Sequence, residues 1–259
     1  MMRFCRASAI GVFVALLQLI PAGAQVPDAV DAMDEKRHIY LLIGQSNMAG
    51  RAPFTEEESG VIGRCLLLNA EDRWEPAKNP LNRYSTIRKG LGMQKMNPGY
   101  SFAEMMLQKQ ADITLGLVVN AKGGSSIKEW AKGTKFYEEA VRRTRVAQKS
   151  GKLKGILWHQ GESDRTDADY LPKLKALVTA LRKDLGIPLL PFVCGQIKDV
   201  PLINDQLMEL ASSVPMTACA SSDGLTTMDR WHFDAKSVKL LGMKYASLML
   251  SLTTDPKKP

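Results

Sequence analysis

The sequence predicts an α/β protein in which helices cover both faces of a parallel sheet. Short apolar runs rich in β-branched residues alternate with longer stretches of 3.6-residue periodicity, which is the pattern of strands joined by crossover helices. Polar clusters follow several of the apolar runs, and ligands of such sheets bind just outside the carboxyl ends of the strands. A single α/β domain accounts for the length of the chain, 259 residues.

The expected elements follow from this alternation. Strands are predicted near residues 38–44, 64–69, 113–120, 154–159, 188–194 and 216–220, and helices near 100–111, 135–150, 168–185, 203–213 and 235–252. The helix near 168–185 is the most regular, with leucines on one face and an end at Gly186, before Pro188.

Residues 70–99 contain so many prolines, glycines and asparagines that we expect no regular element there. A segment of this length inside a compact domain is usually functional or mobile. It either overhangs a site as part of a substrate wall or forms a solvent-exposed insertion.

The N-terminus resembles a secretory signal. Arg3 and Arg6 precede an apolar stretch over 9–20, and a small-x-small pattern ends at Ala24. We therefore expect a signal peptide over 1–24, a polar leader over 25–36, one folded domain over 37–253 and a tail over 254–259. We also expect export to the periplasm or the medium. An uncleaved anchor is the alternative, but the apolar stretch is short for a span of about 20 residues.

Charge and cysteine usage exclude several classes of function. The formal net charge is +8, but the basic residues are dispersed along helical faces, so we expect a solvated surface and no nucleic-acid partner. After signal cleavage we also expect no membrane partner. The remaining cysteines, Cys65, Cys194 and Cys219, have no CxxC or Cys/His spacing, so we predict no structural zinc site. Cys194 and Cys219 lie in apolar runs and are expected to be buried rather than bridged.

Ser46 is the candidate nucleophile. It follows the apolar run Tyr40–Ile43, between Gly44 and Asn47, so its hydroxyl is presented where a buried strand ends in a turn. An ordinary turn with a capping serine explains the same pattern. Further polar clusters at strand ends favour catalysis, and they cover residues 120–126, 158–164 and 229–233.

A serine nucleophile requires a base and a group that orients the base. His38 lies at the opposite end of the first predicted strand from Ser46, and His159 could shape the pocket. His232 follows Asp229 by three residues, so this carboxylate can hold the imidazole ring. Alternatively, Asp229 merely begins the turn into the last helix.

Acyl transfer also requires donors to the developing oxyanion. The backbone amides of Ser46 and Gly124 and the side-chain amide of Gln160 are candidates, and Gly123 allows the chain to approach a substrate closely. A plain loop at the glycines and a structural hydrogen bond at Gln160 are the alternatives.

These blocks resemble a known family. Residues 44–50, 123–127 with Trp130, 158–164 and the Asp229-x-x-His232 pair are similar to the sequence blocks of the sialate O-acetylesterase-type and carbohydrate esterase family six enzymes, in the SGNH (GDSL-like) hydrolase superfamily. The resemblance covers nearly all of the chain after the signal.

The resemblance implies a three-layer α/β/α sandwich with a flavodoxin-like sheet, and metal-free hydrolysis of O-acetyl esters on sugars such as xylan. It implies Ser46 as nucleophile and His232 as base, with oxyanion donors from Ser46, Gly124 and Gln160. In this branch Glu162 competes with Asp229 to orient the base. Further residues expected to contact the substrate are Asn47, Gly123, His159, Trp130 and Trp231.

The sequence therefore predicts an exported serine esterase that removes O-acetyl groups from carbohydrates by two-step acyl transfer. One alternative is a lipase, thioesterase or arylesterase of the same superfamily. The other is a secreted, non-catalytic carbohydrate-binding protein. Trp74, Trp130 and Trp231 could offer flat surfaces to sugar rings or could lie in the core.

Overall fold

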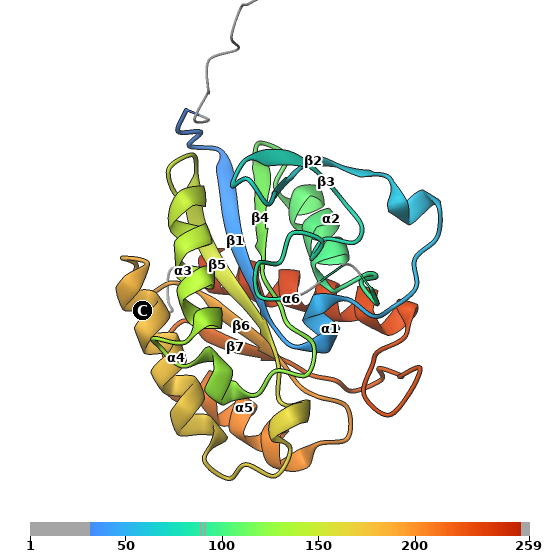
Figure 1. Cartoon of the computed structure of the whole chain (residues 1–259), viewed down its shortest axis with the longest axis vertical. Helices are drawn as coiled ribbons and strands as arrows, with labels where there is room; N and C mark the ends of the chain where they lie inside the picture. Colours follow the sequence, from blue (N-terminus) through green and yellow to red (C-terminus); the bar gives the residue numbers. More distant parts are fainter. Residues whose placement is uncertain (1–31, 89, 91, 255–259) are drawn as a thin grey trace, which may run out of the picture.

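The computed structural model describes residues 32–88, 90 and 92–254, and Figure 1 shows a central sheet flanked by helices. The predicted signal peptide, most of the polar leader and residues 255–259 lie outside the described residues. Within the described ranges, no helix is both long and apolar enough to cross a membrane.

In the described part of the chain, seven strands form one sheet in the order β3-β2-β4-β1-β5-β6-β7. The strands are β1 (Arg37–Gly44), β2 (Val61–Leu68), β3 (Trp74–Lys78), β4 (Thr114–Val119), β5 (Lys152–His159), β6 (Phe192–Gly195) and β7 (Thr217–Ala220). Neighbouring strands are parallel except β2 and β3, which are antiparallel. All six predicted strands are present.

Strand β3 corrects the expectation that residues 70–99 hold no regular element. Its sequence, Trp-Glu-Pro-Ala-Lys, buries only Ala77 fully, so it lacks the apolar run of an inner strand. An edge strand requires little apolar surface and tolerates a proline such as Pro76, because one of its sides has no partner strand. The sheet is therefore mostly, not wholly, parallel.

The helices are α1 (Ser46–Ala49), α2 (Gly99–Lys109), α3 (Lys135–Ala147), α4 (Tyr170–Asp184), α5 (Pro201–Ser213) and α6 (Ala235–Thr254). Short 3-10 helices cover Glu57–Ser59 (η1), Ile127–Trp130 (η2) and Glu162–Asp164 (η3). The five long helices are confirmed within a few residues of their predicted bounds. The four-residue helix α1 was not predicted, because one turn of helix has no measurable periodicity.

Alternating side chains of β1 pack into two hydrophobic clusters formed by described residues. Ile39, Leu41 and Ile43 belong to the cluster that includes apolar residues of α3, α4 and α5. Tyr40 and Leu42 belong to the cluster that includes those of α2 and α6. Successive side chains of a strand point to opposite faces, so the central strand is buried on both sides. The three cysteines of the described residues are unbridged. Cys65 and Cys194 are buried, whereas Cys219 is only partly buried, which corrects its expected burial.

The carboxyl ends of β1, β4 and β5 meet at one edge of the sheet, because β1 is parallel to both of its neighbours. Gly44 ends β1 at a φ of 138°, and a Cβ there would lie 2.1 Å from the carbonyl oxygen of His159. The next amide, that of Gln45, donates to this same oxygen across 2.8 Å. Glycine is therefore required for the chain to turn against β5 and present the following serine.

Candidate active site

Ser46 lies at the first position of α1, directly beyond β1, and only 6% of its surface is exposed. Its side chain borders a cavity of about 340 Å³ that is also lined by Gln45, Gly124 and His232. The backbone amides of Ser46 and Gly124 have no acceptor among the described residues. Two residues with free backbone amides, one of which also carries a hydroxyl, therefore line one cavity, and their roles as nucleophile and oxyanion donors stay predictions.

His232 is held by Asp229. The Nδ1 atom of the ring lies 2.7 Å from Oδ2 of Asp229, while Oδ1 accepts from the backbone amides of Trp231 and His232 at 2.8 and 2.9 Å. Burial alone would raise the pKa of Asp229, but these hydrogen bonds outweigh it and lower the pKa to about 2. The carboxylate is thus charged at neutral pH, and it leaves Nε2 of the ring as the nitrogen that can take up a proton.

Glu162 occupies a different position from the one expected of an orienting group. Its Oε1 accepts a hydrogen bond of 2.8 Å from Nδ2 of Asn47, and no hydrogen bond joins it to His232. Burial raises the pKa of Glu162 to about 7. The geometry therefore assigns contact with the histidine ring to Asp229, while Glu162 lines the same cavity without a hydrogen bond to that ring.

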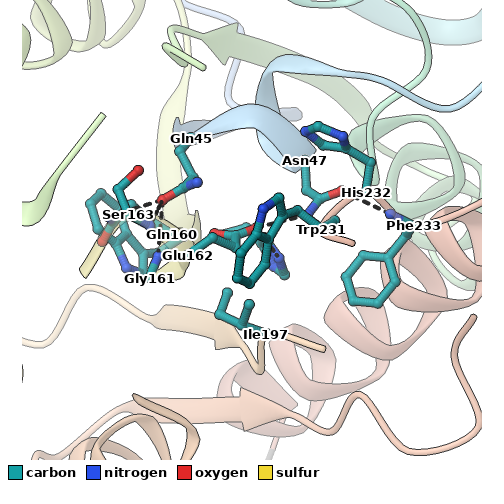
Figure 2. Close-up of polar contacts among 12 residues, drawn as sticks. Gln45, Asn47, Gln160, Gly161, Glu162, Ser163, Ile197, Trp231, His232 and Phe233 are labelled. Carbon is teal, nitrogen blue, oxygen red and sulfur yellow. Dashed lines mark hydrogen bonds and ion pairs between the residues drawn. The ribbon is translucent and has the colours of Figure 1, made fainter. Parts of the chain in front are cut away.

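Asn47 connects the serine turn to the histidine loop (Figure 2). Besides Glu162, its Nδ2 reaches the carbonyl oxygen of Trp231 at 2.9 Å, and its Oδ1 accepts from the amide of Phe233 at 3.1 Å. The side chain is 2% exposed, so the expected contact of Asn47 with substrate is wrong. Its hydrogen bonds position the two residues on either side of His232.

The predicted oxyanion donor Gln160 is also wrong. Its side chain is fully buried, and Nε2 is shared by acceptors on Gln45, Ser125 and Asp164. An oxyanion cannot reach an amide that is enclosed and already hydrogen-bonded. Gln160 instead forms structural hydrogen bonds, which was the alternative stated for it.

Gln45, and not Gln160, lines the cavity of Ser46. Its Oε1 accepts from Nε2 of Gln160 at 3.0 Å and from the backbone amides of Gly161 and Ser163 at 3.2 and 3.3 Å (Figure 2). Because backbone amides can only donate, the orientation of the Gln45 amide is settled, and its Nε2 points away from these groups. That nitrogen has no partner among the described residues, and Gln45 lines the cavity of Ser46. Sequence reasoning missed Gln45 as a cavity residue, because its position resembles that of an ordinary turn residue.

Two further expected substrate contacts are corrected by burial. His159 is fully buried, its Nδ1 lies 2.7 Å from the hydroxyl of Tyr245, and burial lowers its pKa to about 3. Trp130 is also fully buried, packed edge-on against Trp158, with Nε1 donating to Ser125. A neutral core histidine and a core tryptophan cannot touch a sugar. Both residues lie next to motif residues in the sequence, which suggested substrate contact, but both side chains point into the core.

Trp231 does line the cavity, as expected. The guanidinium groups of Arg230 and Arg165 lie 4.7 and 5.8 Å from the centre of its ring. Trp74, in contrast, does not line this cavity. Its ring packs against Gly116 of β4, and its Nε1 donates to the hydroxyl of Ser150, which precedes β5, at 2.7 Å.

The segment 70–99 also contributes to the cavity wall. Met93 lines the cavity, and its carbonyl oxygen accepts from Nη1 of Arg51 at 3.1 Å. Of the two alternatives stated for this segment, the position of Met93 favours a contribution to the cavity wall, although this residue is 69% exposed. Two arginines on the wall, Arg51 and Arg165, were not singled out in the sequence.

Among the described residues, no cluster of histidine, cysteine or carboxylate side chains could hold a metal ion.

A serine beside free amide donors, with a histidine on the same cavity that is held by a carboxylate, is the arrangement that ester-cleaving hydrolases with a serine nucleophile use. Residues 36–251 match the family described as carbohydrate esterase, sialic acid-specific acetylesterase. The chain belongs to this family, and it is accordingly a carboxylic ester hydrolase.

Relatives agree with this assignment. A probable carbohydrate esterase of Arabidopsis thaliana is 32% identical over 237 residues, which cover 82% of this chain and 90% of that protein. The solved structure of an Arabidopsis thaliana protein superposes with a TM-score of 0.74 at 30% identity, over 84% of this chain and 99% of that one.

More distant structures share the fold. NanS has a TM-score of 0.68 at 15% identity, over 85% of this chain and 98% of its own. A carbohydrate acetylesterase from Xanthomonas citri has a TM-score of 0.66 at 17% identity, over 83% of this chain and 56% of its own.

Proposed function

We propose that the protein is an exported serine esterase that removes O-acetyl groups from carbohydrates by a two-step acyl transfer. The observation that carries the proposal is the position of His232, which is held by Asp229 and lines the same cavity as Ser46. The substrate class rests on the family and on the relatives named as carbohydrate esterases.

In the first step the hydroxyl oxygen of Ser46 attacks the acetyl carbonyl carbon while Nε2 of His232 takes up the hydroxyl proton. The charged carboxylate of Asp229 stabilises the imidazolium that forms, because the ring donates to it through Nδ1. The tetrahedral intermediate collapses to an acetyl-serine when His232 returns its proton to the departing sugar oxygen.

The oxyanion of the intermediate is stabilised by donors that are already oriented. We assign these to the backbone amides of Ser46 and Gly124 and to Nε2 of Gln45, whose Oε1 is fixed from behind by three donors. Donors that need no reorganisation stabilise developing charge most effectively. Gly123 keeps the chain beside Ser46 free of a Cβ, which would lie 3.8 Å from the Cβ of Ser46.

In the second step, water attacks the acetyl-serine while His232 acts again as base, and acetate leaves. Every step uses residues of this chain, so we propose no metal and no cofactor. Trp231 is the aromatic surface that we propose for the sugar ring, because it lines the cavity and is half-buried.

We further propose the three-layer, flavodoxin-like arrangement of the SGNH superfamily. Two hydrophobic clusters support it, because side chains from the two faces of β1 belong to different clusters. Export is proposed from residues 1–24 alone, which carry the charge, apolar stretch and small-residue pattern of a signal peptide. N-terminal sequencing of the protein recovered from periplasm or medium tests it, and a start at Gln25 is expected.

The activity is tested by acetate release from acetylated xylan, acetylated sialic acid and a small aryl acetate, with the Ser46→Ala variant beside the wild type. We expect release by the wild type and its loss in the variant. Release that persists in the variant would remove Ser46 from the mechanism. Cleavage of long-chain esters or thioesters in place of acetates would indicate the lipase or thioesterase alternative.

A further inference from the structure

A second cavity, of about 500 Å³, lies next to the proposed catalytic cavity. The two share Arg51, and the adjacent residues Gly123 and Gly124 line one cavity each. A Cβ at Gly123 would lie 2.5 Å from Nη2 of Arg51, so the guanidinium group sits directly at this junction. A ligand longer than one sugar can therefore reach from Ser46 into the second cavity.

The wall of the second cavity is strongly basic. Four of its described lining residues are cationic, namely Arg51, Arg88, Lys122 and Lys135. None of the four forms an ion pair with a carboxylate of the described residues. Like charges gathered without a counter-charge destabilise a fold, so their convergence on one cavity indicates an anionic ligand.

The hydrogen bonds that these cations do make are to backbone carbonyl groups. Arg51 donates to the carbonyl of Gly50 at 2.8 Å, Arg88 to that of Gly90 at 3.1 Å, and Lys122 to that of Gly123 at 3.0 Å. The Nε atom of Arg51 is buried without a partner. These contacts hold the side chains in place while leaving their charge uncompensated.

Helix α3 adds to the positive potential. It begins at Lys135, and Lys135 and Phe136 of its first turn line the cavity. The N-cap Thr134 makes no side-chain cap, because its hydroxyl donates to the carbonyl of Glu129 instead. Uncapped amides at a helix N-terminus favour anions. The carboxylate of Glu139, which interacts with Thr86 of the cavity wall, is held by Arg142 at 3.1 Å.

We propose that the second cavity binds the carboxylate of a uronic acid linked to the acetylated sugar, so that the enzyme acts on acetylated carbohydrates with an acidic neighbouring residue. This inference rests on the proposed function, because it requires that the acetylated sugar occupies the cavity of Ser46. Guanidinium groups such as Arg51 and Arg88 match the planar geometry of a carboxylate. The carboxylate is assigned to the neighbouring residue because the basic cavity lies beside the cavity of Ser46 and shares only Arg51 with it.

The experiment compares kcat/KM for acetate release from three substrates: an acetylated xylo-oligosaccharide with a glucuronic acid branch, the same oligosaccharide without the branch, and O-acetylated sialic acid. The wild type is expected to prefer the acidic oligosaccharide over the neutral one by about tenfold or more, the effect of one or two charged hydrogen bonds. This preference should fall as the salt concentration rises, because salt screens charges at an open cavity.

The variants Arg88→Gln and Lys135→Gln are expected to reduce this preference, and Arg88→Lys should keep part of it. Lys149→Gln is the matched control, since Lys149 is exposed just beyond the opposite end of α3, and it should leave the preference intact. A reduced kcat/KM of the variants on the branched oligosaccharide alone supports a carboxylate on the neighbouring residue. If the variants reduce kcat/KM only on sialic acid, the carboxylate belongs to the acetylated sugar and the inference is overturned.

Equal kcat/KM on acidic and neutral oligosaccharides in the wild type would overturn the inference. So would a preference that Arg88→Gln and Lys135→Gln leave unchanged. In either case, hydrolysis of the aryl acetate that depends on Ser46 would leave the proposed function standing. Failure of the wild type to release acetate from any of the substrates would instead overturn the proposed function itself.

Discussion

Nδ2 of Asn47 donates to Oε1 of Glu162 across 2.8 Å, and this buried hydrogen bond joins the turn that carries the candidate nucleophile to the end of β5. The same asparagine is bonded to the backbone of Trp231 and Phe233. His232 lies between these two residues in the chain. One amide therefore sets the histidine loop relative to the serine turn, and Glu162 fixes the orientation of that amide.

Asn47→Ala should lower kcat about 10- to 100-fold, because three hydrogen bonds of about 1 kcal/mol each are lost and the histidine loop is released. KM should change less, since Asn47 does not reach the cavity. Steady-state kinetics on an aryl acetate, together with urea unfolding, measure both effects. Asn47→Asp retains the acceptor for Phe233 but places a second carboxylate beside Glu162, so it should rescue little. A kcat equal to that of the wild type in Asn47→Ala would show that the loop is positioned by other contacts.

Asp229→Asn should lower kcat by about 10³- to 10⁴-fold, because the histidine would lose the charge that selects its tautomer and stabilises the imidazolium. Glu162→Gln should cost much less, since Glu162 makes no hydrogen bond to the ring. The pH profile of kcat/KM for the two variants gives a second measure, because only Asp229→Asn changes the partner of His232. The opposite ranking of the two variants would assign the orienting role to Glu162.

Gln45→Glu separates two roles of the Gln45 side chain. Glutamate retains an acceptor for the amides of Gly161 and Ser163, but it has no donor for an oxyanion. The variant should therefore fold with nearly wild-type stability and lose about 10²- to 10³-fold in kcat, the usual effect of removing one oxyanion donor. The kcat of Gln45→Ala should fall as well, with a loss of stability in addition. Wild-type kcat in Gln45→Glu would show that Gln45 acts only as a structural acceptor.

The stability of the protein should depend on the ionisation of Glu162. Burial raises its pKa to about 7, above the value in the unfolded chain, so the folded state favours the protonated form. The stabilisation is fully present below the unfolded pKa and is lost as the pH rises through about 7. At about 1.4 kcal/mol per pKa unit, the loss is on the order of a few kcal/mol.

The comparison of the wild type with Glu162→Gln at pH 5 and pH 8 isolates this contribution. Urea unfolding should show that the wild type loses stability relative to the variant as the pH rises. His159 contributes with the opposite sign, because its lowered pKa makes the folded state less stable as the pH falls, but it is present in both proteins. A difference between the two proteins that stays constant from pH 5 to pH 8 would contradict the predicted ionisation.

The inner strands and long helices could be predicted because burial imposes a pattern on them. A strand covered on both faces, such as β1, must be apolar at every position, and the helices that cover it must show a 3.6-residue stripe. Strand β3 carries neither signal, since it lies at the edge and buries only Ala77 fully. Its pairing with β2 was therefore apparent only in the folded chain.

The sequence by itself determined those parts of the candidate site whose residues are close together in the chain. Ser46 follows a buried strand directly, and Asp229 and His232 are close enough in the chain for a turn to bring them together. The tertiary structure decided which side chains face the cavity. Gln45 and Gln160 are both buried glutamines at strand ends, yet only Gln45 lines the cavity and keeps an amide nitrogen without a partner among the described residues. The four cations of the second cavity likewise come from separate segments, and nothing in their spacing along the chain indicates that they converge. Side-chain direction and long-range convergence depend on contacts between residues far apart in sequence, so no local pattern encodes them.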